Sequence, residues 1–281
     1  CLSLARYITR PVRLLQGAVR KVAAGDLSTR VSPQLLDRKD ELASLALDFD
    51  HMAERIEGLL RTQRQMLGDS SHELRTPLTR LSVAVELAEQ GDTAALQRMS
   101  IEIGRINDLI EQILTVTRLD AGDRKPQLEP MDLDGLLAQI VEDGNYAGQQ
   151  RKIRVELTEH SGVRVMADPS LLRTAVENIV HNAMQYTKPE STIEVASRKN
   201  DDNVLIIVRD HGSGVPASAL PRIFEPFYRV SESRSEKAGG RGLGLAISQR
   251  IVSLHGGAIT ARNASDGGLQ VEIVWPGNPQ A

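Results

Sequence analysis

Apolar residues recur at alternating spacings of three and four along the first sixty positions, which predicts two amphipathic helices of coiled-coil type. The first covers residues 11–24, and the second begins at the capping pair Asp40 and Glu41. Gly25 and Asp26 end the first helix, and a polar connector joins it to the second. The two apolar faces consist of Val12, Leu15, Val19 and Val22, then of Leu42, Leu45, Phe49, Met52, Ile56 and Leu59. The two helices can therefore pack in parallel.

The same spacing continues further along the chain and predicts a longer helical hairpin. Gly91 and Asp92 form its turn, and the return helix begins at Thr93. The outgoing face consists of Leu67, Ser71, Leu74, Leu78, Leu81, Val85 and Ala88, and the return face of Leu96, Met99, Ile103, Ile106, Ile110, Ile113 and Thr117. These faces are broad enough to pack against a second copy, so we expect an antiparallel hairpin pair that forms a four-helix-bundle dimer.

The pattern changes after Gly122, where a polar stretch to Pro130 is typical of a linker. Short β-branched runs then alternate with helical patterns. The expected strands are 153–155, 163–166, 193–196, 204–208, 258–260 and 271–274, and the expected helices are 133–149, 169–186 and 243–255. Strands and helices mixed in this way indicate an α/β domain with a mixed sheet covered on one face. The fold is therefore multidomain.

Composition restricts the class of protein. A chain of 281 residues is long enough for two or three domains, and its 3% of aromatic residues suits aliphatic helix seams better than a large sandwich core. The single cysteine excludes a disulfide framework. A net charge of −3 gives no reason to expect nucleic-acid binding.

The first residues have their own charge pattern. Residues 1–8 are mostly apolar, and the basic residues before the first acid, Asp26, are Arg6, Arg10, Arg13, Arg20 and Lys21. This pattern is typical of a transmembrane helix where it ends on the cytoplasmic side. The alternative is the start of an amphipathic helix with a solvated basic face. Because the chain begins with Cys1 rather than methionine, we expect it to be part of a longer protein.

The octet from Ser71 to Leu78 contains a candidate nucleophile. Helical geometry turns His72 away from the apolar face, so its ring is expected to reach solvent. Thr76 lies one turn further along the same face, and Glu73 can hold the imidazole or act as a base. Pro77 cannot bond back to the preceding turn and is expected to bend the helix. A lone histidine on a helix is usually a surface residue without a function. The octet therefore indicates a phosphoryl acceptor only in combination with the motifs that follow it.

The first of these later motifs contains carboxamides on a predicted helix. Asn178 and Asn182 share one helical face, where two oxygens can complete the coordination shell of a phosphate-bound Mg²⁺. Tyr186 lies one turn further on, where it can flank a purine. The segment therefore has the residue types of a nucleotide site.

Two glycine motifs follow. Asp210 comes directly after an expected strand and can accept a hydrogen bond from an exocyclic amine, while Gly212 and Gly214 let the backbone approach a base. The second motif is a glycine-dense loop that enters a helix, so that backbone amides can receive phosphates. It consists of Gly239, Gly240, Arg241, Gly242, Leu243, Gly244 and Leu245.

The octet around His72, followed in order by these motifs, resembles the bacterial two-component sensor histidine kinases over essentially the whole chain. The first helix pair, with Pro11 and Asp40-Glu41 at marker positions, resembles a HAMP signal-relay module; a passive coiled-coil spacer is the alternative. The hairpin resembles the family's dimerisation and histidine phosphotransfer domain, and the remainder resembles the Bergerat (GHKL) ATP-binding sandwich. The residues that flank His72 are most similar to those of the Cpx-type envelope-stress sensors.

The resemblance implies a division of the chain into five segments. They are the end of a transmembrane helix in 1–8, a HAMP domain in 9–62, a dimerisation and histidine phosphotransfer domain in 63–122, a linker in 123–130, and a catalytic ATP-binding domain in 131–281.

The resemblance also implies an activity. A homodimer in the bacterial inner membrane, with this part on the cytoplasmic side, would use ATP and Mg²⁺ to phosphorylate His72. The phosphoryl group would pass to an aspartate of a response regulator, which the protein would also dephosphorylate, with Glu73 and Thr76 as the other catalytic residues. The implied nucleotide contacts are Asn178, Asn182, Tyr186, Asp210, Gly212, Gly214, Arg229, Gly240, Gly242, Leu243 and Gly244, with Asn178 and Asn182 as the metal ligands. The segment that ends near Lys237 resembles the family's ATP lid.

One position departs from the family. Many relatives have a basic residue just before the tyrosine, whereas this chain has Gln185, and Lys188 or Arg229 would have to replace it at the phosphates. Two other functions remain open. One is a Bergerat ATPase that uses water as the acceptor, and the other is a scaffold or a phosphatase that binds ATP without kinase activity.

Overall fold

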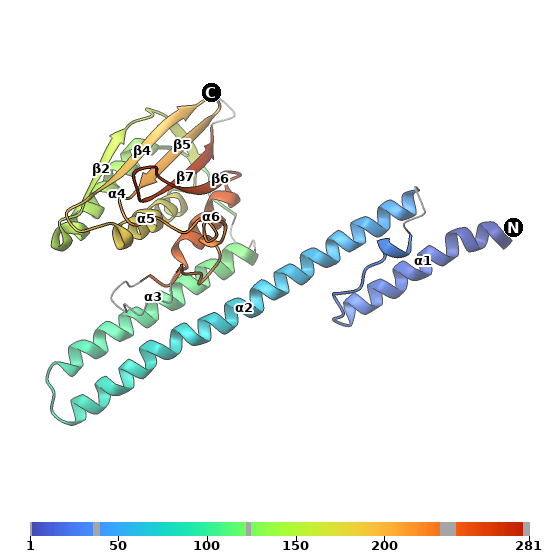
Figure 1. Ribbon diagram of the computed structural model, residues 1–281, viewed down its shortest axis with the longest axis horizontal. Coiled ribbons are helices and arrows are strands. Elements are labelled where there is room, and N and C mark those ends of the chain that lie inside the picture. Colours follow the sequence, from blue (N-terminus) through green and yellow to red (C-terminus); the bar gives the residue numbers. More distant parts are fainter. Residues whose placement is uncertain (1, 36–39, 122–124, 231–239, 278–281) are drawn as a thin grey trace. The chain divides into compact units, whose positions relative to one another are not determined.

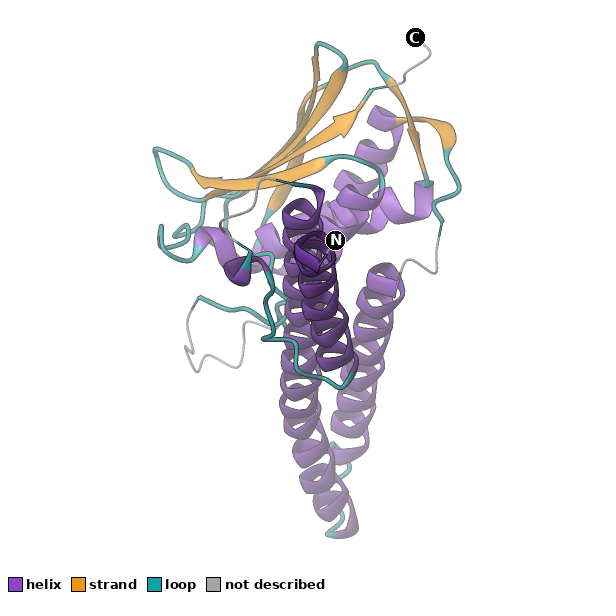
Figure 2. Ribbon diagram, turned by 90° about the vertical axis from the view of Figure 1, so that its right-hand side faces the viewer, coloured by secondary structure: helices purple, strands orange, loops and turns teal. Residues whose placement is uncertain are grey.

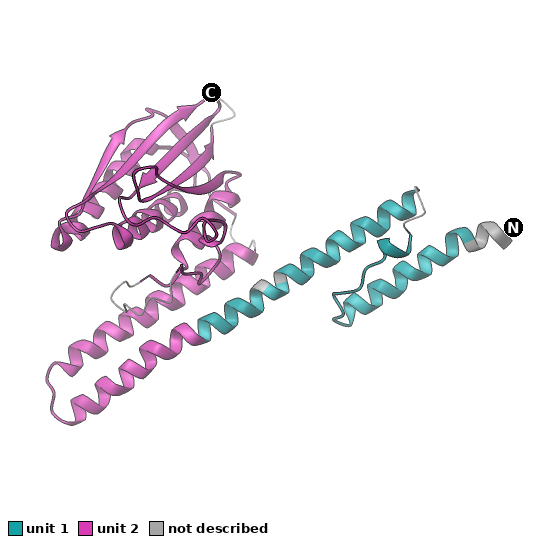
Figure 3. Cartoon of the chain, in the orientation of Figure 1, with its two compact units in different colours: residues 1–71 teal, residues 72–281 magenta. Residues whose placement is uncertain are grey.

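The computed structural model describes residues 2–35, 40–121, 125–230 and 240–277. It divides into two compact units, Cys1–Ser71 and His72–Ala281 (Figure 3). The first unit is helical, and the second combines a helical hairpin with an α/β domain (Figure 1). The expected lid ahead of Gly240, the start of the expected linker and the side chain of Leu59 lie outside the described residues.

The first unit contains α1 (Leu2–Ala23) and the beginning of α2 (Glu41–Glu89), which run parallel as expected, with the short 3-10 turn η1 (Ser32–Gln34) in the connector (Figure 1). Their shared core consists of Leu15, Ala18, Val31, Leu35, Ala46, Phe49 and Ala53. Asp50 on α2 ties down the connector, because its carboxylate accepts the amides of Val31 at 2.7 Å and Ser32 at 2.9 Å. None of the described helices is long and apolar enough to cross a membrane.

The buried face of this helix pair differs in part from the expected one. Leu15 and Phe49 are buried, but Val19, Leu45 and Met52 are each about half exposed. Two helices can bury only the sides that they turn toward each other, and here the small side chains of α2 allow the close approach. The larger apolar residues therefore remain on the surface, where another helix pair can cover them.

The hairpin of the second unit consists of the end of α2 and of α3 (Ala95–Ala121), joined by a turn in which Gly91 has a φ of +88°. The helix continues through Pro77 without interruption. Apolar side chains remain exposed on both helices of the hairpin. They are Leu78, Val83, Val85, Leu96, Ile101, Ile103, Ile110 and Leu114. This surface has the composition of an interface and agrees with the expected bundle of two hairpins.

The α/β domain is built on a five-stranded mixed sheet of order β2-β4-β5-β7-β6, in which only β2 and β4 are parallel. The strands are β2 (Arg154–Glu159), β4 (Thr192–Asn200), β5 (Asn203–Arg209), β6 (Ala258–Asn263) and β7 (Leu269–Pro276). The helices α4 (Leu133–Gly148), α5 (Pro169–Tyr186) and α6 (Gly244–Leu254) cover one face (Figure 2). The 3-10 turns are η2 (Gln149–Arg151) and η3 (Leu220–Arg222). The predicted sandwich is confirmed.

One element was missed by the sequence pattern. β1 (Glu129–Asp132) begins within the stretch expected to be a linker and pairs antiparallel with β3 (Arg164–Ala167) in a separate two-stranded sheet. Its sequence, Glu-Pro-Met-Asp, has no β-branched residue, so the extended conformation comes from pairing with β3 rather than from local propensity.

The core lies between the sheet and its helices. Its largest fully buried side chains include Leu137, Leu172, Ile179, Ile206 and Trp275. At one end His255 packs at 4.6 Å from the Trp275 ring and accepts the amide of Asp168 at 3.2 Å. His255 is therefore a structural histidine whose ring nitrogens both have partners.

Replacement of Asp168 with alanine is expected to lower the free energy of unfolding by about 1–2 kcal/mol. Asp168 is the buried N-cap of α5, and its carboxylate accepts the amides of Ser170 and Leu171. Asp168→Asn keeps an oxygen in the same place and is the matched control. Urea titration followed by circular dichroism measures the difference, and equal midpoints for the alanine variant and the parent would contradict the assigned cap.

Candidate nucleotide site

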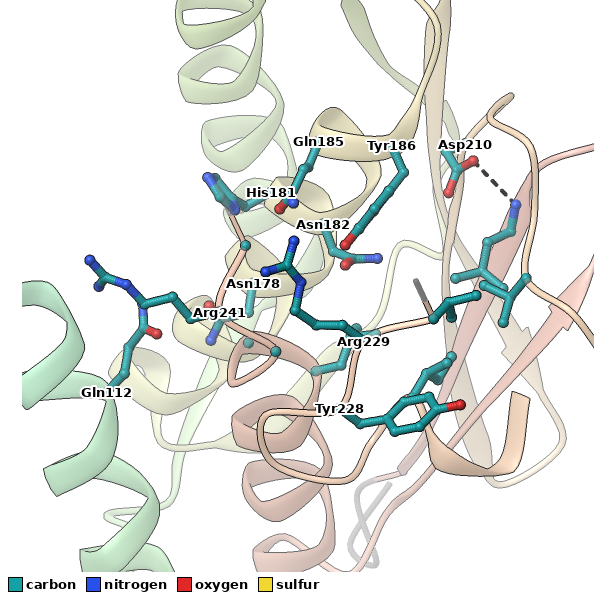
Figure 4. A pocket seen from close by; sticks show the side chains of 18 of the residues that line it. Gln112, Asn178, His181, Asn182, Gln185, Tyr186, Asp210, Tyr228, Arg229 and Arg241 are labelled. Atoms are coloured by element: carbon teal, nitrogen blue, oxygen red, sulfur yellow. Dashed lines mark hydrogen bonds between the residues drawn. The ribbon is translucent and has the colours of Figure 1, made fainter. Parts of the chain in front are cut away.

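A cavity of about 770 Å³ opens between α5, the glycine-dense loop before α6, the loop after β5, and α3 (Figure 4). It brings together most of the sequence-predicted nucleotide residues. Those that line it are Asn178, Asn182, Tyr186, Asp210, Gly214, Arg229, Gly240, Gly242 and Gly244. Gly212 and Leu243 do not line it. Gly212 is buried beside Asp210, and the fully buried Leu243 anchors the start of α6.

The α5 wall presents three side chains at helical spacing. Asn178, Asn182 and Tyr186 follow one another at intervals of four residues and all face the cavity (Figure 4). The opposite side of the helix is buried against the sheet, which fixes its rotation. The N-cap at Asp168 fixes where the helix begins. Core packing and capping together therefore place two carboxamides and one phenol in the same wall.

Asp210 lies at the end of β5 and is almost completely buried. Its Oδ1 accepts the amides of Gly212 at 2.8 Å and Leu269 at 3.2 Å. Burial raises the pKa of this carboxyl, although the two amides act in the opposite direction. Both bonds fall on Oδ1, which leaves Oδ2 to accept a bond from a ligand. A buried acceptor of this kind suits recognition of an exocyclic amine.

Glycines surround the carboxyl because the backbone approaches too closely for a side chain. A Cβ at Gly212 would lie 2.5 Å from the carbonyl oxygen of Tyr186. Gly268 has a φ of +88°, and a Cβ there would collide with the backbone of Asp210. The last glycine pair of the sequence is thus part of the wall behind Asp210.

In the glycine-dense loop, too, the backbone is packed too closely for side chains at the glycine positions. Gly242 has a φ of +74°, and a Cβ there would lie 2.8 Å from the backbone of Phe227. Phe227 itself has a φ of +62°, which L-residues rarely adopt, and its amide donates to the carbonyl of Gly242 at 2.9 Å. A side chain at Gly240 would collide with Gln185. At its glycines the loop therefore presents backbone rather than side chains to the cavity.

The position that departs from the family is partly buried beside this loop. Gln185 lines the cavity, and its Nε2 has no hydrogen-bond partner among the residues that the structure describes. Of the two cations considered as replacements, Arg229 lines the cavity and Lys188 does not. His181 also lines it, at a position that the sequence motif leaves variable. An unsatisfied buried donor beside a glycine loop is available to an anionic ligand.

The fourth wall of the cavity was not predicted from the sequence. Arg105, Asp108, Glu111 and Gln112 on α3 also line the cavity. They precede the first nucleotide motif by more than sixty residues, and nothing in their local pattern marks them, because they become cavity residues only through the packing of α6 against α3.

The candidate phosphoacceptor lies elsewhere. His72 and Thr76 on α2 are exposed, as expected from the helical pattern, and Glu73 between them is partly buried. None of the three lines the cavity. The structure therefore places the nucleotide residues together and the histidine octet on a separate element.

Three family models match the chain in the order of its domains. A HAMP domain model matches residues 3–58, and a His Kinase A (phospho-acceptor) domain model matches residues 62–122. A model of the histidine kinase-, DNA gyrase B- and HSP90-like ATPases matches residues 167–279. The last range contains every nucleotide motif and identifies an ATP-binding domain.

Curated relatives match along nearly the whole chain. The signal transduction histidine-protein kinase AfsQ2 of Streptomyces coelicolor is 32% identical over 301 residues, covering 99% of this chain and 54% of the relative. The sensor histidine kinase CpxA of Escherichia coli strain K12 is also 32% identical, over 277 residues, covering 97% of this chain and 59% of the relative. The match to CpxA agrees with the expected similarity to the Cpx-type sensors. The chain spans between half and two thirds of the length of these relatives.

A solved structure of a histidine kinase is also similar to this chain. The full-length histidine kinase ShkA in complex with AMPPNP is 27% identical with a TM-score of 0.58, over 76% of this chain and 45% of that one. The order of the domains, the nucleotide cavity and these matches agree, and the chain belongs to the bacterial sensor histidine kinases of two-component systems.

Asp210→Asn is expected to weaken ATP binding about tenfold or more, the order of loss for a hydrogen bond to a charged acceptor. The two backbone amides would hold the amide oxygen of asparagine, so its NH₂ would face the amine of adenine. GTP, which has a carbonyl oxygen at that position, should lose less affinity. Titration calorimetry with both nucleotides measures the ratio, with the exposed acid substitution Asp202→Asn as control. Equal losses for ATP and GTP would contradict the assigned recognition.

The raised pKa of Asp210 also predicts a pH dependence of stability. From about pH 4, where the unfolded carboxyl titrates, up to the raised folded value, the folded state binds more protons than the unfolded state. The contribution of this group to the free energy of unfolding therefore falls as the pH rises. Asp210→Asn should flatten that part of the profile, and urea midpoints measured from about pH 4 upward test it. An unchanged slope would contradict the buried-acid assignment.

Proposed function

We propose that this chain is the ATP-using part of a transmembrane sensor histidine kinase. It binds Mg·ATP in the cavity, accepts the γ-phosphoryl group on His72 and passes it to an aspartate of a response regulator, which it can also dephosphorylate. The observation that carries the proposal is the combination, in one chain, of a nucleotide-sized cavity backed by a buried acid and an exposed histidine on a separate helix.

The cavity fits a nucleotide along its length. Its volume lies in the range of small-molecule sites. Asp210 supplies an acceptor for the adenine amine at one end. At the other end the glycine loop and the N-terminus of α6 offer backbone amides and a positive helix end to phosphates. Arg229 is the cation that replaces the missing basic residue at Gln185.

The α5 wall also fits a magnesium ion. Among the described residues, no three or more His, Cys, Asp or Glu side chains converge on a metal site. Asn178 and Asn182 would hold the ion through carboxamide oxygens, and phosphate oxygens would complete the shell. When bound, the ion neutralises charge on the phosphates.

The octet supplies the acceptor. A neutral imidazole with one nitrogen held by a carboxylate presents the lone pair of the other nitrogen, and Glu73 is the adjacent carboxylate. That lone pair attacks the γ-phosphorus, the bond to the bridging oxygen breaks, and ADP leaves. Thr76, one turn along, positions water for removal of phosphate from the regulator. Positioning and charge neutralisation supply most of the acceleration.

The proposed assembly is a homodimer in the bacterial inner membrane. The exposed apolar faces of α2 and α3 support a bundle of two hairpins. The mostly apolar start followed by basic residues supports a membrane helix that ends near residue 8, and the HAMP segment up to about residue 62 would pass its movement to the hairpin. Residues 63–122 would carry the phosphoacceptor and 131–281 the nucleotide site.

His72→Gln is expected to abolish incorporation of phosphate from γ-labelled ATP, because the acceptor nitrogen is lost. ATP binding should be unchanged, since His72 does not line the cavity. The label on the parent chain should be labile to acid and stable to alkali. His51→Gln, an exposed histidine earlier on α2, is the matched control and should label like the parent.

Other outcomes would indicate another function. An unlabelled parent chain that hydrolyses ATP, with full hydrolysis retained in His72→Gln, would indicate an ATPase that uses water as acceptor. A parent chain that binds ATP without label or hydrolysis would indicate a scaffold, or a phosphatase of its regulator. Either result would refute the proposed kinase.

A further inference from the structure

The two residues next to Asp210 in the chain lie outside the cavity. The helices cover one face of the sheet (Figure 2), and Ile206 and Val208 of β5 belong to the core beneath them. Asp210 continues this series into the cavity. Successive side chains of a strand point to opposite faces, so Arg209 and His211 lie on the face away from the helices, and neither lines the cavity.

One carboxylate contacts both neighbours of Asp210. Glu194 lies on β4, directly opposite Arg209 in the antiparallel register. Its Oε1 is 3.0 Å from Nε2 of His211, and its Oε2 is 3.9 Å from Nη1 of Arg209. The chain is thus tied to β4 immediately before and immediately after Asp210, which limits how far the backbone of Asp210 can move.

Arg209 also reaches across β5 to the other side. Its Nη2 donates to Oδ1 of Asp266, in the turn at residues 264–268 between β6 and β7. This bond lowers the pKa of Asp266, as expected for a carboxylate paired with a cation. The Arg209 side chain is only 21% exposed, and its Nε has no partner among the described residues. The guanidinium therefore bridges β4 and the turn through its two terminal nitrogens.

The turn that Arg209 contacts leads directly to a donor for Asp210. Leu269 follows the turn, donates its amide to Oδ1 of Asp210 at 3.2 Å and accepts the amide of Asp210 at 3.0 Å. A shift of the turn would therefore move a donor that aims the carboxylate, and with it Oδ2, which is left for a ligand. Four side chains thus form an open-face cluster around the chain at Asp210: Glu194, Arg209, His211 and Asp266.

We propose that the open-face cluster fixes the direction of the Asp210 carboxylate and thereby sets the preference of the site for adenine over guanine. The inference rests on the proposed kinase function and concerns how its nucleotide is selected. A carboxylate aimed at the exocyclic amine of adenine accepts a hydrogen bond there, and it repels the carbonyl oxygen that guanine has at the same place. Arg209 and Glu194 are positioning residues, because they do not line the cavity and act on the base through Asp210.

Titration calorimetry of the full chain with ATP and GTP tests the proposal in Arg209→Gln and Glu194→Ala. Each variant should weaken ATP binding about two- to fivefold, the effect expected when partly exposed ion pairs are lost. GTP affinity should not fall, because guanine does not donate to Asp210. The autophosphorylation rate at saturating ATP should equal that of the parent, so the effect falls on KM and not on kcat.

A double-mutant cycle with Asp210→Asn separates positioning from a general loss of packing. If Arg209 acts through Asp210, Arg209→Gln should weaken ATP binding in the parent and cause no further loss in Asp210→Asn. Asp266→Asn changes an exposed position of the turn, where the core is not at risk, and should also weaken ATP binding without weakening GTP binding.

Arg198→Gln is the matched control. Arg198 lies on the same face of β4 as Glu194, four residues further along, and pairs with Glu159 at the edge strand β2. Because this pair does not contact the residues next to Asp210, both nucleotides should bind the control variant as they bind the parent.

Amide hydrogen exchange, resolved by residue, provides a readout without nucleotide. The amides of Gly212 and Leu269 are the two donors to Oδ1 of Asp210. Both should exchange faster in Arg209→Gln than in the parent, because the turn and the chain after β5 lose their ties to β4. In Arg198→Gln they should exchange as in the parent.

Three results would overturn the proposal. Equal losses for ATP and GTP would show that the cluster supports the site as a whole and does not select the base. A further loss of ATP affinity in Asp210→Asn would show that Arg209 acts independently of that carboxylate. Unchanged affinities and unchanged exchange would show that the cluster has no influence. If the parent binds ATP but acquires no label, the kinase proposal fails, whereas the affinities and the exchange rates still decide the role of the cluster.

Discussion

The close packing of α5 against α6 is the constraint on which the nucleotide site depends. Ser248 on α6 is fully buried, and its hydroxyl donates to the carbonyl of Ala175 on α5 at 2.7 Å. At the start of α6, Gly244 approaches Asn178 so closely that a Cβ there would lie 3.3 Å from its Oδ1. The hydrogen bond and the missing side chain bring the carboxamide wall beside the helix end that would receive phosphates.

The same packing connects the nucleotide site to the hairpin. α6 lies between α5 and α3, so the helix that closes one end of the cavity also carries the contact with the phosphoacceptor domain. Arg250 makes that contact through a bidentate ion pair with Asp120. A change in how α6 meets α3 would therefore alter the α3 wall of the cavity, while the contacts between α5 and α6 that shape the other walls could persist. This separation suits a reaction in which a rigid nucleotide domain must approach a histidine on a different element.

Much of the fold was predictable because the apolar pattern follows directly from the geometry of helices and strands. The helix expected at residues 169–186 coincides with α5, and Gly91-Asp92 forms the expected hairpin turn. The apolar pattern failed to predict elements whose conformation or burial depends on strand pairing or on the close approach of two helices. β1 is extended only because β3 pairs with it, and α2 buries Ala46 and Ala53 in preference to Leu45 because small side chains let α1 come near. Neither effect is visible in a window of local sequence.

The sequence by itself determined the chemistry that is present: an imidazole beside a carboxylate on a helix, two carboxamides four residues apart, an acid next to glycines, and a glycine-dense loop before a helix. Only the tertiary structure decided which of these groups meet. It buried Asp210 behind Gly268, put Arg229 rather than Lys188 at the cavity, and closed the fourth wall with residues of α3. The physical reason is the distance along the sequence over which each property is set. Side-chain chemistry and helical spacing are local properties, whereas burial and contact between distant segments are set by the packing of the whole domain.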